Sequence, residues 1–331
     1  SRSEAGRGRR GSIGGGGAAD LKEQLDEAGE SKLKRLAKQI GITGATGEDD
    51  LFLLDTPQLA KRLGIERVRP VVLGDEVRHW INTSAVVTLW PYEADFTVLP
   101  LERIPRMAKL LWPYRSLISR RKPFGIPILQ RGMAWYEWQE LYTAKLKTPL
   151  TITFGEVSSH NHFHLDRGGS VFNRTAPVLK LRDDASEAEH LAILGLMNSS
   201  TACFWLRQAC FPKGGDHQGT EGARVRTTLW DERYAFNSTQ VGGFPVASEQ
   251  PLLLTTELDR LASELHATTP SSLLTVTALD VAPALKNARQ QHEQILQRMI
   301  AVQEELDWEC YRAYRLFLES CHLPPDQVPP I

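Results

Sequence analysis

The chain has 331 residues, 41% of them hydrophobic, and its 39 basic and 40 acidic side chains give a formal net charge of -1. This length allows about two domains of ordinary size. The near-neutral charge excludes a uniformly basic nucleic-acid coat, so any DNA-binding charge must be local. No apolar run approaches the roughly 18 to 20 residues that span a bilayer, and no signal-peptide core is present, so we expect a cytoplasmic protein with no membrane partner.

The cysteines lack the paired CxxC spacing of zinc sites and the density of a disulfide framework. We therefore expect buried thiols at Cys203, Cys210, Cys310 and Cys321.

The first part of the chain divides into a flexible segment and a helical one. Residues 1–19 are rich in Gly, Ser and Arg, lack the ending of a phosphate loop and do not begin with Met, so we expect a flexible start inside a longer chain. Periodic apolar residues predict a helical lead-in over 20–40, broken near Gly29 and stopped by Gly41. Another short helix is predicted at 58–63, with short strands at 52–54 and 70–73.

The middle of the chain is predicted to be rich in β-structure. Short apolar runs between Gly, Ser and Asn turns over 148–181 indicate strands. Ser186, with acidic residues in the following turn, predicts the start of a helix that runs to Met197, and a second helix is expected over 202–210. A Gly-rich loop follows at 213–222.

The C-terminal part shows a helical seam. Apolar positions from Leu285 to Leu306 alternate steps of three and four, which indicates an antiparallel helix pair or coiled coil, with a partner helix expected over 252–265. Four prolines in the tail end regular structure.

The densest basic stretch extends from Arg103 to Lys122, and only Glu102, directly before it, opposes its charge. Such a stretch can supply phosphate contacts, or it can be a solvated helix face. Aromatic residues that can stack on bases, or simply pack in a core, interleave with it: Trp90, Tyr92, Trp112, Tyr114, Phe124, Trp135, Tyr136 and Trp138.

Motifs for catalysis are weak. His160, His162 and His164 would share one face of a strand, a pattern that fits polar strand contacts or a DNA-facing surface better than a metal site. No nucleophile-elbow motif is present. The Asn/Asp/Ser-Pro-Pro-aromatic loop with which amino-methyltransferases hold a flipped base is also missing.

Several segments, taken in order and spacing, resemble the C-terminal half of the phage-growth-limitation X (PglX) family, the adenine-specific DNA methyltransferases of BREX phage-defence systems. The resemblance runs from about residue 41 to 318. It rests on TGEDDLF at 46–52, RPVVLGDEVRHW at 69–80, WYE at 135–137, FNRTAPVLK at 172–180, LGLMNSSTACFW at 194–205 and QEELDW at 303–308. The stretch FPKGG at 211–215 departs from the Asn-Lys-Gly-like stretch of the family.

The resemblance implies a target-recognition region, as in related type IIG restriction-modification enzymes. Its partners would be double-stranded DNA, the upstream catalytic domain of the parent chain and other BREX components. S-adenosylmethionine would bind the parent protein upstream. We assign this chain no catalytic residue, cofactor-binding residue or metal ligand, and predict that it is inactive alone.

We therefore expect an α+β fold with a β-rich recognition lobe and a helical C-terminal region. The expected divisions are 1–19 flexible, 20–40 helical, 41–245 DNA recognition, 246–322 helical and 323–331 a Pro-rich tail. Phosphate contacts are predicted at Arg115, Arg120, Arg121 and Lys122. Base contacts are predicted at Arg78, His79, Asn82, Arg131 and Lys213. Two alternatives stay open: a module that docks another defence component, and the specificity region of a type IIG enzyme.

Overall fold

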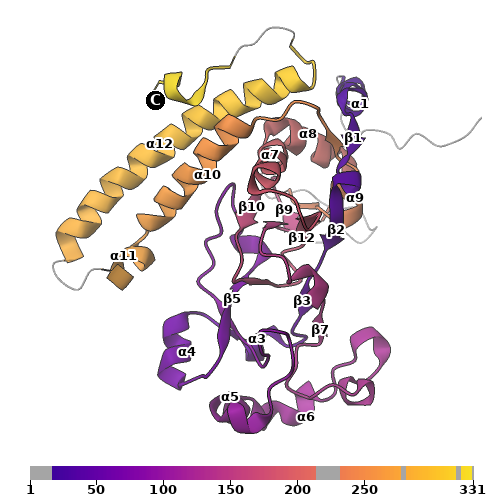
Figure 1. The fold of residues 1–331 in the computed structure, drawn as a ribbon, viewed down its shortest axis with the longest axis vertical. Coiled ribbons are helices and arrows are strands. Elements are labelled where there is room, and N and C mark those ends of the chain that lie inside the picture. The colour runs from indigo at the N-terminus through magenta and orange to yellow at the C-terminus, as the bar shows by residue number, and fades with distance from the viewer. Residues whose placement is uncertain (1–16, 214–231, 277–280, 318–321, 330–331) are drawn as a thin grey trace, which may run out of the picture.

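The structure is a computed structural model that describes residues 17–213, 232–276, 281–317 and 322–329. It has the α+β fold expected from the sequence, with a helix-rich body and a smaller distal lobe at one end (Figure 1). We call residues 44–146 and 171–172 the distal lobe and the remaining described residues the body.

An antiparallel sheet lies at the centre of the body, in the order β10 (Phe163–Asp166), β8 (Thr151–Phe154), β12 (Val178–Leu181) and β2 (Ala37–Gly41). Every residue of β8 and β12 is buried, so both faces of the sheet are covered. The β-structure predicted over 148–181 is thus confirmed.

The helical prediction for residues 20–40 is correct only in part. Helix α1 (Ala18–Ala28) forms as expected, but β1 (Ser31–Lys32) and the one-turn helix α2 (Leu33–Leu36) follow it, and β2 replaces the last turn. Ile40 pairs with Leu179 of β12 at the edge of the sheet. Pairing with a distant strand overrides the local helical periodicity here.

Helix α7 (Glu187–Met197) packs on β10 and β8 of the sheet, and α8 (Ser200–Ala209) packs against α7 and α12 (Val281–Ala313), which confirms the two helices predicted there. Ser186 and Glu189 form a reciprocal capping box at the start of α7. Two buried asparagines fix the junction between the helices: Asn198 exchanges hydrogen bonds with the backbone of Phe163, and the amide of Asn161 donates to the carbonyls of Met197 and Ser199.

The predicted C-terminal seam is present as helix α10 (Leu252–Ala267) packed against the long helix α12 (Val281–Ala313). Its buried side chains include Leu258, Leu265, Val302 and Leu306. The short helix α11 (Pro270–Val276) precedes α12, and a 3-10 turn at Pro325–Gln327 lies in the tail. No helix of the described residues is both long and apolar enough to cross a lipid bilayer.

Small elements complete the body. A three-stranded sheet contains β13 (Phe211–Pro212), β14 (Tyr234–Ala235) and β9 (Val157–Ser158), and β1 pairs with β15 (Pro245–Val246). Helix α9 (Ser238–Gly242) packs near β2. Cys210 and Cys310 are buried, as predicted, whereas Cys203 is partly exposed and Cys321 lies outside the described residues.

The distal lobe has its own sheet and its own core. The sheet order is β11 (Val171–Phe172), β5 (Val68–Val72), β6 (Val87–Leu89) and β4 (Leu53–Leu54), and β3 (Gly44–Ala45) pairs with β7 (Glu140–Leu141) beside it. The lobe's helices are α3 (Asp49–Phe52), α4 (Pro57–Leu63), α5 (Pro105–Leu111) and α6 (Arg115–Ile118). The helix predicted at 58–63 and the strand predicted at 70–73 are present, and the strand predicted at 52–54 forms at Leu53–Leu54, whereas Phe52 ends α3.

Trp80 joins the lobe-side loop to the body. This buried residue has a left-handed backbone (φ 70°); its amide donates to Phe163 and its indole Nε1 donates to Oε1 of Gln303 on α12 at 2.9 Å. The core of the body draws residues from both sides of position 245, for example Ile152 and Leu258. The boundary expected at 245 therefore does not coincide with a break in packing.

The contact of α7 with α10 gives a first prediction. A Cβ on Gly195 of α7 would lie 2.0 Å from Oγ1 of the buried Thr255 of α10. We expect Gly195→Ala to lower the free energy of unfolding by about 1–3 kcal/mol, because the packed helices must separate. Urea denaturation measures this loss. Leu253→Ala, on the exposed side of α10, is the matched control and should change it by less than about 0.5 kcal/mol; equal effects of the two changes would contradict the packing argument.

Candidate nucleic-acid interface

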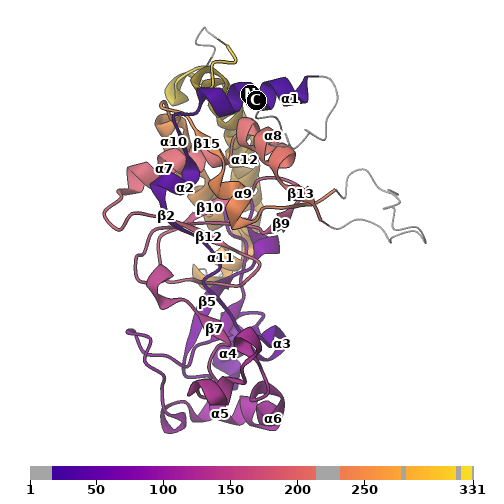
Figure 2. The same cartoon turned by 90° about the vertical axis from the view of Figure 1, so that its right-hand side faces the viewer.

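Exposed cations gather on residues 112–131, which we call the basic tip. This segment contains α6 and three 3-10 turns, Trp112–Tyr114, Pro123–Gly125 and Ile128–Arg131, at the end of the distal lobe. Figures 1 and 2 place α5 and α6 at the end of the molecule opposite α1. Within the described part of the chain, none of the exposed residues Arg115, Arg120, Lys122 and Arg131 forms an ion pair.

Three of the four predicted phosphate contacts, Arg115, Arg120 and Lys122, lie exposed on the basic tip. Arg121 does not belong with them, which corrects the sequence prediction. It is only 5% exposed, and its guanidinium donates to the carbonyls of Thr46, Ile118, Trp135 and Glu137. Arg121 follows the end of α6, and its side chain turns inward to these carbonyls while those of Arg120 and Lys122 stay exposed.

The guanidinium of Arg121 organises the base of the tip. Its Nη2 lies 2.8 Å from the Trp135 carbonyl and 2.7 Å from that of Glu137, and its carbon lies 5.1 Å from the ring centroid of Phe52. Burial lowers its pKa to about 10. No carboxylate of the described residues is hydrogen-bonded to it, and backbone carbonyls of distant segments stabilise the charge.

The aromatic residues that interleave with the basic stretch separate into two groups. Trp90, Tyr92, Trp135, Tyr136 and Trp138 are buried in the lobe core. Trp112, Tyr114 and Phe124 are 55%, 46% and 71% exposed and lie on the basic tip.

Cations stack on the exposed rings. The guanidinium carbon of Arg115 lies 4.9 Å from the centroid of Trp112, and that of Arg131 lies 5.6 Å from the centroid of Phe124. Such pairs hold a planar cation and an aromatic face together at one surface. This combination can contact phosphates and bases at once.

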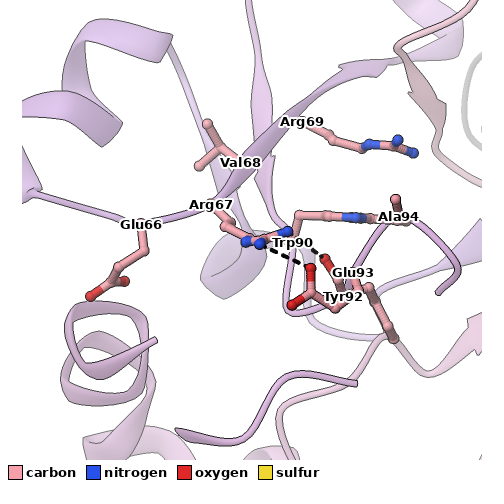
Figure 3. A pocket seen from close by; sticks show the side chains of 8 residues that line it. All are labelled: Glu66, Arg67, Val68, Arg69, Trp90, Tyr92, Glu93 and Ala94. Carbon is pink, nitrogen blue, oxygen red and sulfur yellow. Dashed lines mark hydrogen bonds and ion pairs between the residues drawn. The ribbon is translucent and has the colours of Figure 1, made fainter. Parts of the chain in front are cut away.

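A pocket of about 470 Å³ lies beside β5 and β6, and its arginines differ in their partners. Figure 3 shows Arg67 paired with Glu93, while Arg69 extends separately. The guanidinium carbon of Arg69 lies 4.9 Å from the Trp90 centroid, and no described residue accepts a hydrogen bond from that guanidinium. Burial lowers the pKa of Arg69. A stacked arginine with open donors can bind a phosphate or a guanine edge.

The structure does not bring the predicted base-contacting residues together. Arg131 lies on the basic tip, whereas Arg78 and His79 line an apolar groove of about 410 Å³ between the loop at 78–81 and helices α10 and α12. Asn82 lines a neighbouring pocket of about 320 Å³, and its Oδ1 accepts from the amide of Ser84. Lys213 lies exposed after β13, and residues 214–222 of the predicted Gly-rich loop lie outside the described residues.

The three alternating histidines do not share a strand face. Only His164 lies on β10, where its Nδ1 contacts the carbonyl of Trp80, while His162 packs edge-on against His79 with ring centroids 4.7 Å apart. Burial, followed by the charges of His79 and Arg78, lowers the pKa of His162 to about 3. Among the residues that the structure describes, no cluster of His, Cys, Asp and Glu has the arrangement of a metal site.

Sequence reasoning missed Arg69 and did not single out Phe124. Arg69 lies within the pairing of β5 with β6, and its stacking on Trp90, the residue after β6, is a tertiary contact that the sequence does not reveal. Phe124 stood out only as one aromatic residue among many.

Two solved restriction-modification enzymes are similar to the chain. The type IIL enzyme MmeI in complex with DNA has 16% sequence identity and a TM-score of 0.44, over 87% of this chain and 36% of that one. The type IIG restriction endonuclease BpuSI has 12% identity and a TM-score of 0.46, over 90% and 34% respectively. No protein-family model matches the chain.

The sequence comparison is more specific. The chain is 41% identical over 313 residues to the adenine-specific methyltransferase PglX of Streptomyces coelicolor, which covers 94% of this chain and 26% of the relative. The resemblance to PglX predicted from the sequence is therefore confirmed, and the chain spans about a quarter of the length of this relative.

The hydrogen bonds from the buried guanidinium of Arg121 to backbone carbonyls give a second prediction. We expect Arg121→Met to lower the free energy of unfolding by about 3 kcal/mol or more, because several buried carbonyls lose their donor. Arg120→Met, at the exposed neighbouring position, is the control and should change stability by less than about 0.5 kcal/mol. Chemical denaturation of both variants measures the free energy of unfolding. Similar values for the two variants would show that the hydrogen bonds of Arg121 do not stabilise the lobe.

The pair of His162 and His79 gives a third prediction, which concerns the pH dependence of stability. Since the folded pKa of His162 lies below the unfolded value of 6.5, the unfolded state binds more protons, and stability should fall as the pH falls from 6.5 toward 3. His162→Phe should make this fall shallower between pH 6.5 and 5, where few carboxylates titrate. Urea denaturation at each pH tests it, with Leu253→Ala on the exposed side of α10, which removes no titratable group, as the control that keeps the wild-type slope. An unchanged slope in His162→Phe would contradict the assignment.

Proposed function

We propose that this chain is the DNA-recognition portion of an adenine-specific (N6) DNA methyltransferase of a BREX-type phage-defence system. The observation that carries the proposal is the 41% identity to PglX over 94% of the chain. Because the chain spans only part of that relative, DNA binding and the defence context are parts of the proposal.

The basic tip supports DNA as the partner. Arg115, Arg120 and Lys122 are exposed and unpaired within the described residues, although the chain as a whole carries a formal charge of -1. Cations without counter-ions at one end of a near-neutral protein favour a polyanionic partner, since release of condensed counter-ions drives such binding. Arg69 on Trp90 adds a candidate contact beside the same lobe.

In this proposal, methyl transfer belongs to another part of the parent protein. S-adenosylmethionine would supply the methyl group there, and the residues of this chain would orient the duplex. The chain's sequence contains neither a phosphate-type glycine loop nor the Pro-Pro-aromatic loop that holds an extruded adenine. The specificity region of a type IIG restriction-modification enzyme would use the same surface.

The groove at α10 and α12 favours a second candidate function, docking of another protein component. Leu296 and Ile300 of α12 line it and are 38% and 53% exposed. Deletion of residues 278–331 does not test this candidate, because Val302, Leu306 and Cys310 are buried in the body core. Leu296→Ser with Ile300→Ser removes the apolar surface instead; lost association with a partner and retained DNA binding would favour docking.

DNA binding gives a fourth prediction. Gel shifts of a mixed-sequence 30-base-pair duplex, repeated over a salt series, should show binding by the wild-type chain that weakens as salt rises. The variant Arg115→Ala/Arg120→Ala/Lys122→Ala should bind more weakly and lose up to about 0.9 in the log–log salt slope for each phosphate contact removed.

The control variant Lys34→Ala/Lys286→Ala/Arg289→Ala removes the same charge from exposed positions of the body and should keep the wild-type slope. Absent or salt-independent binding by folded wild-type protein would overturn the proposed function. Equal losses in the two variants would show that the tip is not the contact surface.

A further inference from the structure

Phe124 is held on the surface in a left-handed backbone conformation that residues other than Gly, Asn and Asp seldom adopt. Its φ and ψ angles are 52° and 33°, and its side chain is 71% exposed. It lies between the buried Pro123 and Gly125, which also has a positive φ of 82°. A large apolar side chain is thus both strained and solvated, a combination that recurs where a side chain acts on a partner.

The turn that carries Phe124 is fixed by several hydrogen bonds. The amide of Gly125 donates to Lys122, that of Ile126 donates to Pro123, and that of Ile128 donates to the carbonyl of Arg121 at 2.9 Å. Since Arg121 is itself held in its carbonyl cage, the turn is anchored directly to the lobe core. The ring therefore projects from a defined support.

The surroundings of Phe124 are apolar and cationic. Ile126 and Leu129 are 50% and 53% exposed, and Arg131 donates to the Pro123 carbonyl while its guanidinium stacks over the Phe124 ring. Residues 122–131, KPFGIPILQR, include two cations and no acidic residue. The charge complements a polyanion, whereas an apolar protein partner would have to desolvate both cations.

We propose that Phe124 is a wedge that enters the minor groove and inserts between two base pairs of duplex DNA, with Lys122 and Arg131 contacting the phosphates on either side. This inference rests on the proposed function. Insertion of an apolar side chain partly unstacks a base step and bends the duplex away from the protein. Pyrimidine–purine steps such as TpA would be preferred, because they unstack most easily.

A wedge of this kind would also assist the chemistry of the parent protein. Extrusion of an adenine requires that its stacking be broken. An aromatic ring inserted at a nearby step lowers the remaining work of unstacking while the phosphate contacts hold the duplex in place.

The test uses the full 331-residue chain and a 30-base-pair duplex with one central TpA step, donor and acceptor dyes at its ends, and 2-aminopurine as the adenine of that step. Binding of the wild-type chain should raise energy transfer between the ends and increase 2-aminopurine fluorescence. Phe124→Asn removes the ring and suits the left-handed backbone, so the turn should be kept and the melting temperature should equal or exceed that of wild type.

We expect Phe124→Asn to bind within about tenfold of wild type but to lose both fluorescence changes, and Phe124→Trp to keep them. A Phe124→Asn variant that still bends and unstacks the duplex would overturn the wedge and leave the proposed function intact. Absence of binding by the wild-type chain would overturn both. Unchanged DNA behaviour together with loss of self-association in ultracentrifugation would assign the ring to contact with a second copy instead.

Discussion

The buried guanidinium of Arg121 is the interaction on which the basic tip depends. Its donors reach carbonyls from three separate parts of the distal lobe: Thr46 near the start, Ile118 one turn earlier, and Trp135 and Glu137 beyond the tip. Burial of an unpaired cation is costly, and only the simultaneous satisfaction of these carbonyls offsets it. The hydrogen bonds of Arg121 therefore connect the tip to the rest of the lobe and fix its geometry. The side chains on the outer face of the tip take no part in them.

Lys180 in the body is likewise a buried cation whose charge is stabilised by backbone carbonyls. Its ammonium donates to the carbonyls of Thr148 and Leu150 and to Oγ1 of Thr151, and burial lowers its pKa to about 8. The segments that carry the resemblance to PglX meet at such joints: Trp80 bonds to Gln303, and Asn173 donates to Asp49 at 2.9 Å. In this chain, side chains of those segments therefore connect distant parts of the fold.

The sequence predicted the elements whose signals are local. Ser186 and Glu189 define the start of α7 within four residues, and the apolar steps along α12 are visible without knowledge of its partner. It failed where a distant contact decides the outcome: Ile40 joins a strand because β12 lies beside it, and Arg121 is buried because four carbonyls converge on it. Residue type alone placed Arg120, Arg121 and Lys122 in one functional class, whereas only the path of the backbone separates a surface cation from an internal one.

The exposed side chains of the basic tip contribute little to the stability of the distal lobe. The lobe core is complete without the tip's outer face, because Phe52, Trp90 and Trp138 pack with one another and Arg121 closes the turn from within. Arg115, Arg120, Lys122 and Phe124 can therefore add little to folding, and the strained backbone of Phe124 subtracts from it. In the proposed complex, duplex DNA would supply the contacts that these residues lack, because its phosphates complement the cations and its bases can stack on the Phe124 ring.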